Sequence, residues 1–202
     1  MIGEKELRCG DDVAKIKTNF KRAPLILPVC LVGANVKEKP NFQAIAWFNM
    51  VDYDPYLVGF SSERSHYTNK GIKENKTFSV NIPASNMASV TDYCGLHSGI
   101  EVDKSKIFNV FYGELHTAPM ISVTPINVEC KLTQTIESHH ADFFIGEIVS
   151  VYIEEKYLVN GKPDMKNIDP LLYEDGLGSY WSLGKFLAKA FDIGKQFKPE
   201  SQ

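Results

Sequence analysis

The sequence lacks long hydrophobic runs, a secretory leader and an excess of positive charge. No uninterrupted apolar stretch approaches the roughly 20 residues of a membrane-spanning helix. Half of residues 1–8 are charged, and the segment lacks the apolar core of a signal peptide. The formal net charge is −3, which gives no basic footprint for nucleic acid or an anionic membrane. We therefore expect a soluble, cytoplasmic protein with no nucleic-acid or membrane partner.

Cysteine is also sparse, and the common nucleotide-binding motifs are missing. The four cysteines, at positions 9, 30, 94 and 130, form no C-x-x-C pair and have no zinc spacing. Their number would permit disulfides, but in a reducing cytosol free thiols are favoured. Neither Gly-x-Gly-x-x-Gly nor Gly-x-x-x-x-Gly-Lys occurs. A Rossmann dinucleotide site and a Walker phosphate loop are therefore not supported.

No catalytic or metal-binding constellation stands out either. The segment 95–99 contains Ser98 between glycines, but its spacing is not that of a hydrolase nucleophile elbow. Cys94 could be a thiolate nucleophile, yet such cysteines are mostly packing residues. His139 and His140 are adjacent, so on one strand they would face opposite sides and could share a metal only across a turn. A single histidine lining a ligand pocket is the better interpretation. We predict no catalytic side chain and no metal.

The residues that are present predict one mostly β domain. With 44% hydrophobic and 23% charged residues, the composition is that of a globular protein, and we find no repeat, low-complexity stretch or linker. The clearest strand alternates apolar and polar residues from Ile126 to Leu132. Short turns between several strands suggest an antiparallel meander closing toward a barrel. The expected strands cover residues 25–32, with an edge, bulge or break at Pro28, and residues 42–51, 56–61, 77–81, 126–133 and 143–153.

Helical spacing is limited to three places. A short helix follows the turn at 62–68, a second helix begins after residue 83, and Phe186, Leu187, Ala190 and Phe191 mark the apolar face of a third. We expect a single domain over residues 1–202, with a peripheral N-terminal segment at 1–22 and a C-terminal tail and helix at 176–202.

The turn at residues 62–68 carries the most suggestive chemistry. Hydroxyl groups and the Arg64 guanidinium gather where a strand gives way to a helix start. A helix N-terminus presents oriented N–H donors, and arginine adds a planar, permanently charged fork, so the turn could seat a phosphate. Alternatively, Ser62 or Ser65 simply caps the helix and Arg64 lies in solvent.

A set of segments in fixed order resembles the flavin reductase-like, FMN-binding split-barrel family, and within it the flavoredoxin group. The resemblance extends over nearly the whole chain from about residue 23. The matching segments are Asn41…Ala46-Trp47…Asn49, Pro55, Ser61-Ser62-x-Arg64…Thr68, Phe78-Ser79-Val80-Asn81-Ile82-Pro83, Cys94-Gly95…Ser98-Gly99…Asp103-Lys104, Ala118-Pro119, Val128-Glu129-Cys130, Gly146-Glu147-Ile148-Val149, Asn160-Gly161-Lys162…Asp169-Pro170-Leu171 and Tyr180-Trp181.

This resemblance implies a six-stranded antiparallel Greek-key split barrel with a few flanking helices. It also implies a homodimer with FMN at or near the subunit interface. By position, the phosphate would be held by Ser61, Ser62, Arg64, Thr68 and Lys104. The flavin ring would lie beside Asn41, Trp47, Phe48 and Asn49, and His140 and the Tyr180-Trp181 pair would approach it, the latter from the other subunit. For Trp47 and Phe48, core packing is the alternative.

The implied function is oxidoreduction through bound FMN, with NADH or NADPH as reductant. Because the flavin carries the chemistry, the chain itself needs no nucleophile or acid–base pair. Two alternatives stay open. The protein could be an FMN-binding electron carrier without nicotinamide activity, passing electrons to a redox partner protein, or a non-catalytic flavin-binding module.

Overall fold

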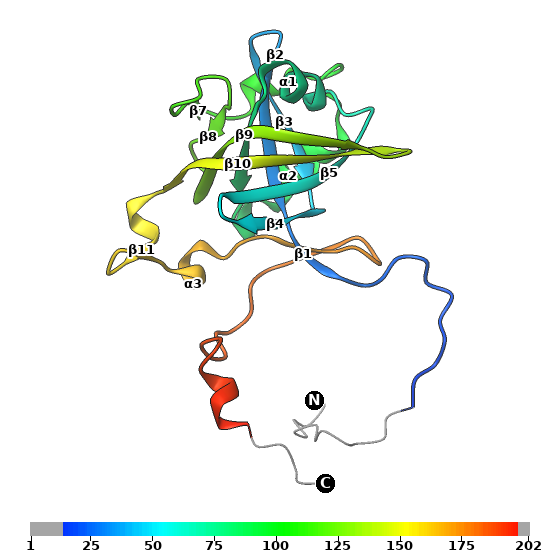
Figure 1. The fold of residues 1–202 in the computed structure, drawn as a ribbon, viewed down its shortest axis with the longest axis vertical. Helices are drawn as coiled ribbons and strands as arrows, with labels where there is room; N and C mark the ends of the chain where they lie inside the picture. The colour runs from blue at the N-terminus through cyan, green and yellow to red at the C-terminus, as the bar shows by residue number, and fades with distance from the viewer. Residues whose placement is uncertain (1–13, 198–202) are drawn as a thin grey trace.

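The computed structural model describes residues 14–197 and is dominated by a seven-stranded antiparallel sheet. Figure 1 shows this sheet curled into a barrel. Its strands follow one another in the order β3-β2-β6-β9-β10-β5-β4. Their bounds are β2 (Cys30–Val36), β3 (Lys39–Ile45), β4 (Phe48–Tyr53), β5 (Tyr56–Glu63), β6 (Thr77–Ile82), β9 (Ile126–Glu137) and β10 (Ala141–Ile153).

The two edge strands of this sheet, β3 and β4, are consecutive in the chain. Only Ala46 and Trp47 separate them, so the sheet must curl back on itself. The Ser61 amide of β5 donates to the Trp47 carbonyl (2.9 Å) at this seam. The mainly β split barrel with Greek-key crossovers is thus confirmed. It has seven strands rather than six because the strand expected over 42–51 is broken at the seam.

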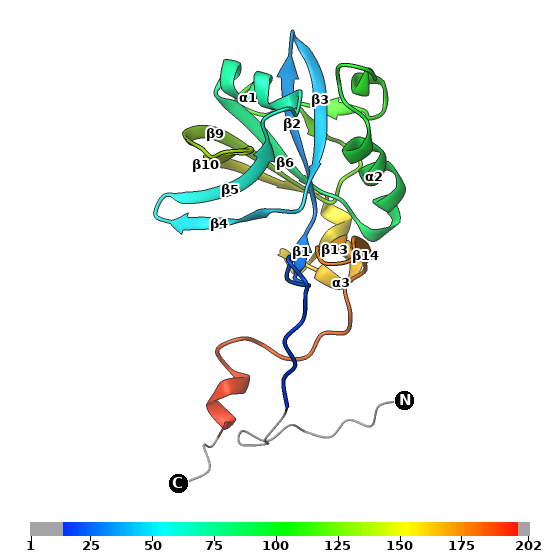
Figure 2. The same ribbon diagram turned by 90° about the vertical axis from the view of Figure 1, so that its right-hand side faces the viewer.

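Two helices cover the barrel. Helix α1 (Thr68–Asn75) connects β5 to β6 and packs on β2, while α2 (Ala88–Leu96) follows the 3-10 turn η1 (Ser85–Met87) and packs on β3. Figure 2 shows them on different sides of the barrel. The structure therefore confirms a helix after the turn at 62–68 and another after residue 83.

The barrel interior is the main hydrophobic core. Phe60, Phe78 and Phe144 are fully buried there, with Phe60 and Phe78 in edge-to-face contact at 5.3 Å between ring centroids. Each buried phenylalanine stabilises the fold by about 1.5–3 kcal/mol. The Cys30 and Cys130 thiols lie in the same core, and Cys94 lies in a smaller core beside Phe42. All three are free thiols, and Cys9 lies outside the described residues.

Pro28 breaks the first strand, as predicted. The chain forms β1 (Ile26–Pro28) and then β2, because proline cannot donate to the ladder. Strand β1 pairs instead with β13 (Leu172–Glu174), which pairs with β14 (Ser179–Trp181), in a small sheet beside the barrel. The remaining elements are η2 (Lys104–Lys106), β7 (Val110–Phe111), β8 (Met120–Ile121), η3 (Glu155–Tyr157), β11 (Leu158–Val159), β12 (Lys162–Pro163), α3 (Met165–Ile168) and η4 (Ile193–Gln196).

The helix predicted around Phe186 and Phe191 does not form. Residues 182–190 have no regular structure, and the one element that follows within the described residues is η4. Helical spacing is not sufficient for so short a segment, because most helical stability comes from packing of the apolar face. In the structure this face is exposed, with Phe186 at 79% and Phe191 at 96%.

Two extended arms leave the barrel on the side of the small sheet, residues 14–24 and 182–197 (Figures 1 and 2). Residues 14–24 are exposed, and residues 1–13 of the segment predicted to be peripheral lie outside the described part. Across the described helices, none is long and apolar enough to cross a membrane.

Candidate functional site

A two-part cleft lies between β3, the start of α1, and α2. Its two hollows share Ala44, His66 and Gly95, so they form one continuous cleft. The aromatic hollow, about 340 Å³, is also lined by Trp47, Ser61, Glu63, Asp92, Tyr173, Asp175 and Tyr180. The polar hollow, about 290 Å³, is also lined by Asn41, Gln43, Ser65, Tyr67, Thr68, Cys94, His97, Ser98, Gly99 and Lys104.

The start of α1 forms one wall of the polar hollow. The first amides of a helix have no partner within it. Here the amides of Asn69 and Lys70 donate to the carbonyls of His66 and Tyr67 in a tightened first turn, and among the described residues the Thr68 amide has no backbone partner. Thr68 is buried, and its Oγ1 accepts a hydrogen bond from Asn41 Nδ2 (2.8 Å). The Thr68 hydroxyl proton therefore stays available to an acceptor in the hollow, next to the positive end of the helix dipole.

Lys104 places a buried cation in the same hollow. Its side chain is 3% exposed, and Nζ donates to the carbonyls of Phe42 (2.8 Å) and Cys94 (2.7 Å). An ammonium has three donors, so one remains. Within residues 14–197, no carboxylate lies within ion-pair distance of Nζ. Burial lowers the pKa of Lys104, partly opposed by Cys94. An anionic ligand such as phosphate would compensate this charge.

Cys94, beside Lys104, is a packing residue. Burial raises the pKa of its thiol to about 11, although the Lys104 charge pulls in the other direction. The thiol is therefore protonated at neutral pH, and it packs against Leu31, Phe42 and Ile121. The packing interpretation of Cys94 thus agrees with its surroundings, since a nucleophile must be a thiolate.

Large rings enclose the aromatic hollow. Trp47 Nε1 donates to Asp175 Oδ1 (3.3 Å), and the rings of Tyr173 and Tyr180 lie 5.6 Å apart. The Tyr180 hydroxyl donates to Asp92 Oδ1 (3.0 Å). Burial is the main cause of a raised pKa of Tyr180, and the Asp92 carboxylate is the second cause, so the phenol stays protonated. Aromatic walls with a few fixed polar groups suit a flat heterocycle.

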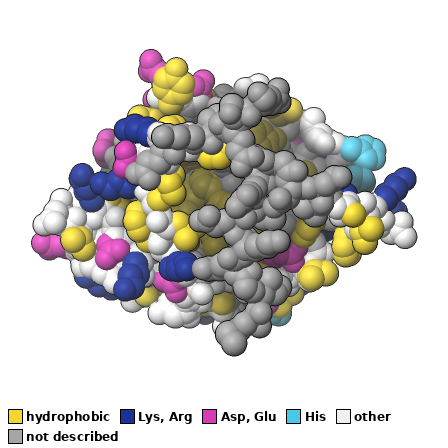
Figure 3. Space-filling view, turned by 90° about the horizontal axis from the view of Figure 1, so that it is seen from below, with side chains coloured by type: hydrophobic (Ala, Val, Ile, Leu, Met, Phe, Trp, Pro, Cys, Tyr) yellow, Lys and Arg dark blue, Asp and Glu magenta, His cyan; other side chains and the backbone are white. Residues whose placement is uncertain are grey.

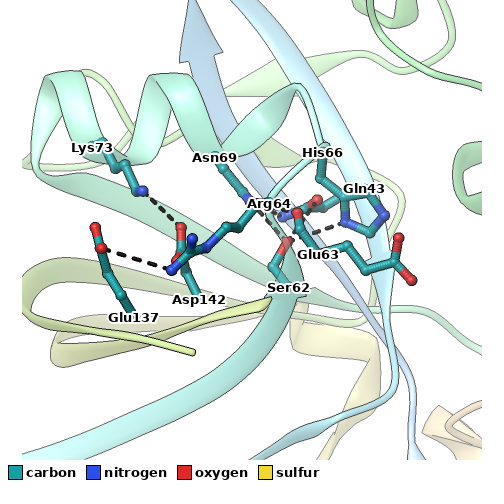
Figure 4. Close-up of polar contacts among 9 residues, drawn as sticks. All are labelled: Gln43, Ser62, Glu63, Arg64, His66, Asn69, Lys73, Glu137 and Asp142. Atoms are coloured by element: carbon teal, nitrogen blue, oxygen red, sulfur yellow. Dashed lines mark hydrogen bonds and ion pairs between the residues drawn. The ribbon is translucent and has the colours of Figure 1, made fainter. Parts of the chain in front are cut away.

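The alternation of side chains along β5 separates the predicted phosphate residues. Ser61 and Glu63 line the cleft, whereas Ser62 and Arg64 point away from it. Ser62 is 2% exposed, and its hydroxyl contacts Asn69, His66 and Gln43 (Figure 4). Its contribution is to hold those neighbours in place.

Arg64 forms ion pairs on the opposite side of the strand (Figure 4). Its Nε donates to Asp142 Oδ1 at 3.1 Å, and its Nη2 lies 3.7 Å from Glu137 Oε2. Lys73 of α1 reaches the same Asp142 carboxylate at 2.6 Å. Burial alone would raise the pKa of Asp142, but the hydrogen bonds and charges of Lys73 and Arg64 outweigh it and keep that pKa low. The structure thus does not bring Arg64 to the cleft.

The other predicted residues divide between the cleft and its surroundings. Asn41, Trp47, Ser61, Thr68 and Lys104 line the cleft. Phe48 and Asn49 instead line an adjacent apolar groove of about 640 Å³, which also includes Leu25, Leu27, Trp47, Met50, Val51, Gly59, Ser61 and Phe143.

His140 and Trp181 lie outside both hollows. His140 is at the β9–β10 turn, where its ring contacts that of His139 (4.4 Å between centroids) and its carbonyl accepts from the Arg64 amide. Trp181 is 57% exposed, and its Nε1 donates to Ser179 Oγ (3.0 Å).

Sequence reasoning missed several cleft residues. Gln43 lies two positions after Asn41 on β3, so strand alternation places it on the same face and could have identified it. His66 lies inside the predicted turn and was passed over in favour of Arg64. Asp92 shows no local signal, because only the packing of α2 on β3 brings it to the cleft.

Comparison with known proteins identifies the family. Residues 22–180 match the family model described as the flavin reductase like domain. A flavoredoxin from Methanosarcina acetivorans is 49% identical, with a TM-score of 0.87 over 91% of this chain and 98% of that one. A flavoredoxin from Desulfovibrio vulgaris (Miyazaki F) is 33% identical, with a TM-score of 0.82 over 89% and 100%. An FMN-binding protein from Thermus thermophilus, 24% identical with a TM-score of 0.71 over 88% and 99%, shares the fold.

The chain therefore belongs to the flavin reductase-like family of flavin-binding oxidoreductases. Within this family, its likeness in both sequence and structure is to flavoredoxins.

Proposed function

We propose that this protein is an FMN-dependent oxidoreductase that takes electrons from NADH or NADPH. The observation that carries the proposal is the joined cleft. Its polar end holds a buried lysine that has no carboxylate partner among residues 14–197, and its other end is an aromatic slot. A molecule with an anionic end and a flat aromatic end matches both halves, and FMN has this form.

The residues fit the cofactor as follows. Lys104 and the hydroxyl and backbone amide of Thr68 would hold the phosphate, with Ser98 and Gly99 closing the same hollow. A Cβ at Gly99 would lie 2.2 Å from Asn41 Oδ1, so only glycine permits this close approach. Trp47 and Tyr180 would flank the ring. FMN supplies the hydride and electron chemistry, and the chain orients it and excludes water.

A second candidate is an FMN-binding electron carrier that has no nicotinamide activity and serves a redox partner protein. The observation that favours it is the likeness to two proteins named flavoredoxins.

The test is flavin binding followed by anaerobic reduction. Purified protein should bind FMN at micromolar concentration, and NADH or NADPH should bleach the bound flavin in stopped-flow measurements. Reduction by dithionite but by neither nicotinamide would select the electron carrier. Failure to bind FMN would end both proposals and leave a family member without flavin chemistry.

We also propose a homodimer. Strand β4 is exposed along nearly its whole length, with Met50 at 49%, Val51 at 45% and Tyr53 at 80%. The apolar groove beside it is open, and hydrophobic side chains are visible on the face from which the arms leave (Figure 3). Exposed apolar area of this extent usually marks an interface, and two-fold dimers are the commonest assembly.

A further inference from the structure

We propose that His66 binds the flavin directly: its Nε2 accepts a hydrogen bond from a hydroxyl of the sugar-alcohol chain, at the junction of the two hollows. This inference rests on the proposed function. It adds a binding contact and fixes which ring nitrogen makes it.

The hydrogen bonds of Asn69 determine the orientation of its side-chain amide. Its Nδ2 donates to the Glu63 carbonyl (2.8 Å), so its Oδ1 faces Ser62 and Gln43. Gln43 Nε2 donates to this Oδ1 at 3.2 Å, and Ser62 Oγ lies 2.8 Å from it. The Asn69 oxygen can only accept, so the Ser62 hydroxyl must donate to it.

The Ser62 hydroxyl in turn determines which nitrogen of His66 carries a proton. The Ser62 hydroxyl has one proton, and it donates this proton in a hydrogen bond to Asn69 Oδ1, which is the shortest of its three contacts. His66 Nδ1 lies 3.1 Å from the same Ser62 Oγ. Two lone pairs would repel at this distance, so Nδ1 carries a proton and donates to Ser62. In a neutral imidazole, Nε2 is then the acceptor.

His66 itself lies at the junction of the two hollows. His66 lines both hollows, and Figure 4 shows its ring joined to Ser62 through one nitrogen only. Within residues 14–197, Nε2 has no hydrogen-bond partner. Burial lowers the pKa of His66, an effect that Lys104 reinforces and Glu63 opposes. The neutral ring thus presents an acceptor to the cleft.

The ligand group that meets this acceptor follows from the division of the cleft. A phosphate at Lys104 and a ring beside Trp47 leave the connecting chain of the flavin at the residues that both hollows share. That connecting chain carries hydroxyl groups, which are donors. The imide N–H of the ring is the other donor of a flavin, and the experiment below distinguishes the two.

The tautomer can be tested without flavin. Nitrogen-15 NMR of the histidine-labelled protein, with His66 assigned by its loss in a His66→Asn variant, should show a proton on Nδ1 and none on Nε2 near neutral pH. Ser62→Ala should remove this preference. A proton on Nε2 in the unmodified protein would overturn the proposal.

Binding provides the second test. An asparagine at position 66 retains a donor near the place of Nδ1 but has no group at Nε2, whereas a glutamine places its carbonyl near Nε2. His66→Asn should weaken the binding of riboflavin about tenfold, which is the effect of one lost hydrogen bond. His66→Gln should bind riboflavin with most of the affinity of the original protein. Lumiflavin, which has the ring but no sugar-alcohol chain, should bind both variants as it binds the original protein.

Equal riboflavin affinity for the two variants would contradict the proposal, as would an equal loss for riboflavin and lumiflavin in His66→Asn. The latter result would assign Nε2 to the ring. These outcomes are distinct from failure of the proposed function, in which the unmodified protein itself would not bind riboflavin or FMN.

Discussion

At the scale of single residues, Lys104 concentrates the anion-binding capacity of the cleft. It is buried, it is held by two backbone carbonyls, and it has one ammonium donor left. The carbonyls fix its position without neutralising its charge. A charge held in this way attracts an anion more strongly than an exposed lysine would, because little water screens it.

We predict that Lys104→Met weakens the binding of FMN about tenfold to a hundredfold and that of riboflavin little, because only FMN carries the phosphate. This is the value of a charge-assisted hydrogen bond. Fluorescence titration with both flavins measures it. Lys106→Met is the matched control, since this lysine lies on the same 3-10 turn and is exposed. Equal losses for the two flavins would assign Lys104 to folding or to the ring.

The lowered pKa of Lys104 predicts a pH dependence. Its folded-state pKa lies below the ordinary 10.5 because of burial, so Lys104 in the folded protein loses its proton at a lower pH than an exposed lysine does. A bound phosphate favours the charged form. The ratio of FMN to riboflavin affinity should therefore fall as the pH rises toward 10.5, and the ratio removes effects common to both flavins. Lys104→Met should abolish the decline, and an unchanged ratio in the original protein would contradict this role.

For Arg64, the structure changes the prediction made from the sequence. Its guanidinium binds Asp142 and Glu137, away from the cleft. We therefore predict that Arg64→Ala leaves the ratio of FMN to riboflavin affinity unchanged within about twofold, well below the loss expected of a charge-assisted contact. The same titrations measure it. A selective loss of FMN would show that Arg64 reaches the phosphate in the loaded protein, as the resemblance implied.

At the scale of elements, Asp142 connects β10 to β5 and α1. Its carboxylate is 1% exposed and binds Arg64, just after β5, and Lys73 of α1. Strand β10 pairs with β5, and Arg64 lies in the turn that precedes α1. The ion pair between Arg64 and Asp142 therefore holds this turn against β10. The start of α1 forms a wall of the polar hollow, and the ion-pair cluster thus supports the cleft from behind.

We predict that Asp142→Asn lowers the free energy of unfolding by about 1–3 kcal/mol, because two cations lose their common partner. Urea denaturation at neutral pH measures it. The pKa of Asp142 is below the ordinary 3.8, so its contribution is complete above 3.8 and is lost as the pH falls through the folded value. Glu137→Gln, at an exposed carboxylate 3.7 Å from Arg64, should change stability by less than about 0.5 kcal/mol. Comparable losses in the two variants would contradict the cluster's role.

At the scale of the whole molecule, the β4 region and the C-terminal arm each expose several large apolar side chains. The arm exposes Leu183, Phe186, Leu187, Phe191, Ile193 and Phe197. The groove beside β4 is apolar and adjoins the aromatic hollow through Trp47 and Ser61. A second copy that covered these surfaces would also close the cleft where the ring is proposed to lie.

We predict that Phe191→Asp weakens the homodimer by at least about tenfold, because burial of a phenylalanine contributes about 1.5–3 kcal/mol. The bound FMN should be released as the subunits separate. Light scattering at two concentrations, measured together with flavin fluorescence, tests both effects. Ser182→Asp adds the same charge at a polar position of the arm and should have little effect. A monomer that keeps its FMN would refute a shared site.

The sequence by itself determined the β architecture and much of the cleft. Alternation from Ile126 to Leu132 and the break at Pro28 are local signals, and local backbone chemistry was sufficient to place them. Thr68 and Lys104 were named as phosphate residues through the family resemblance, and both line the polar hollow. Such residues act through side chains whose type and position are visible in the chain itself.

The tertiary structure alone decided which side chains face the cleft and which residues from distant parts of the chain contact them. Ser62 and Arg64 carry suitable groups but point away from the cleft, because the register between β5 and β10 pairs that face with Asp142. Gln43 of β3, His66 of the turn before α1 and Asp92 of α2 are far apart in the sequence, and only the folded chain brings them to one cleft. The C-terminal helix failed for the same reason, since an apolar face becomes a helix only when something packs against it.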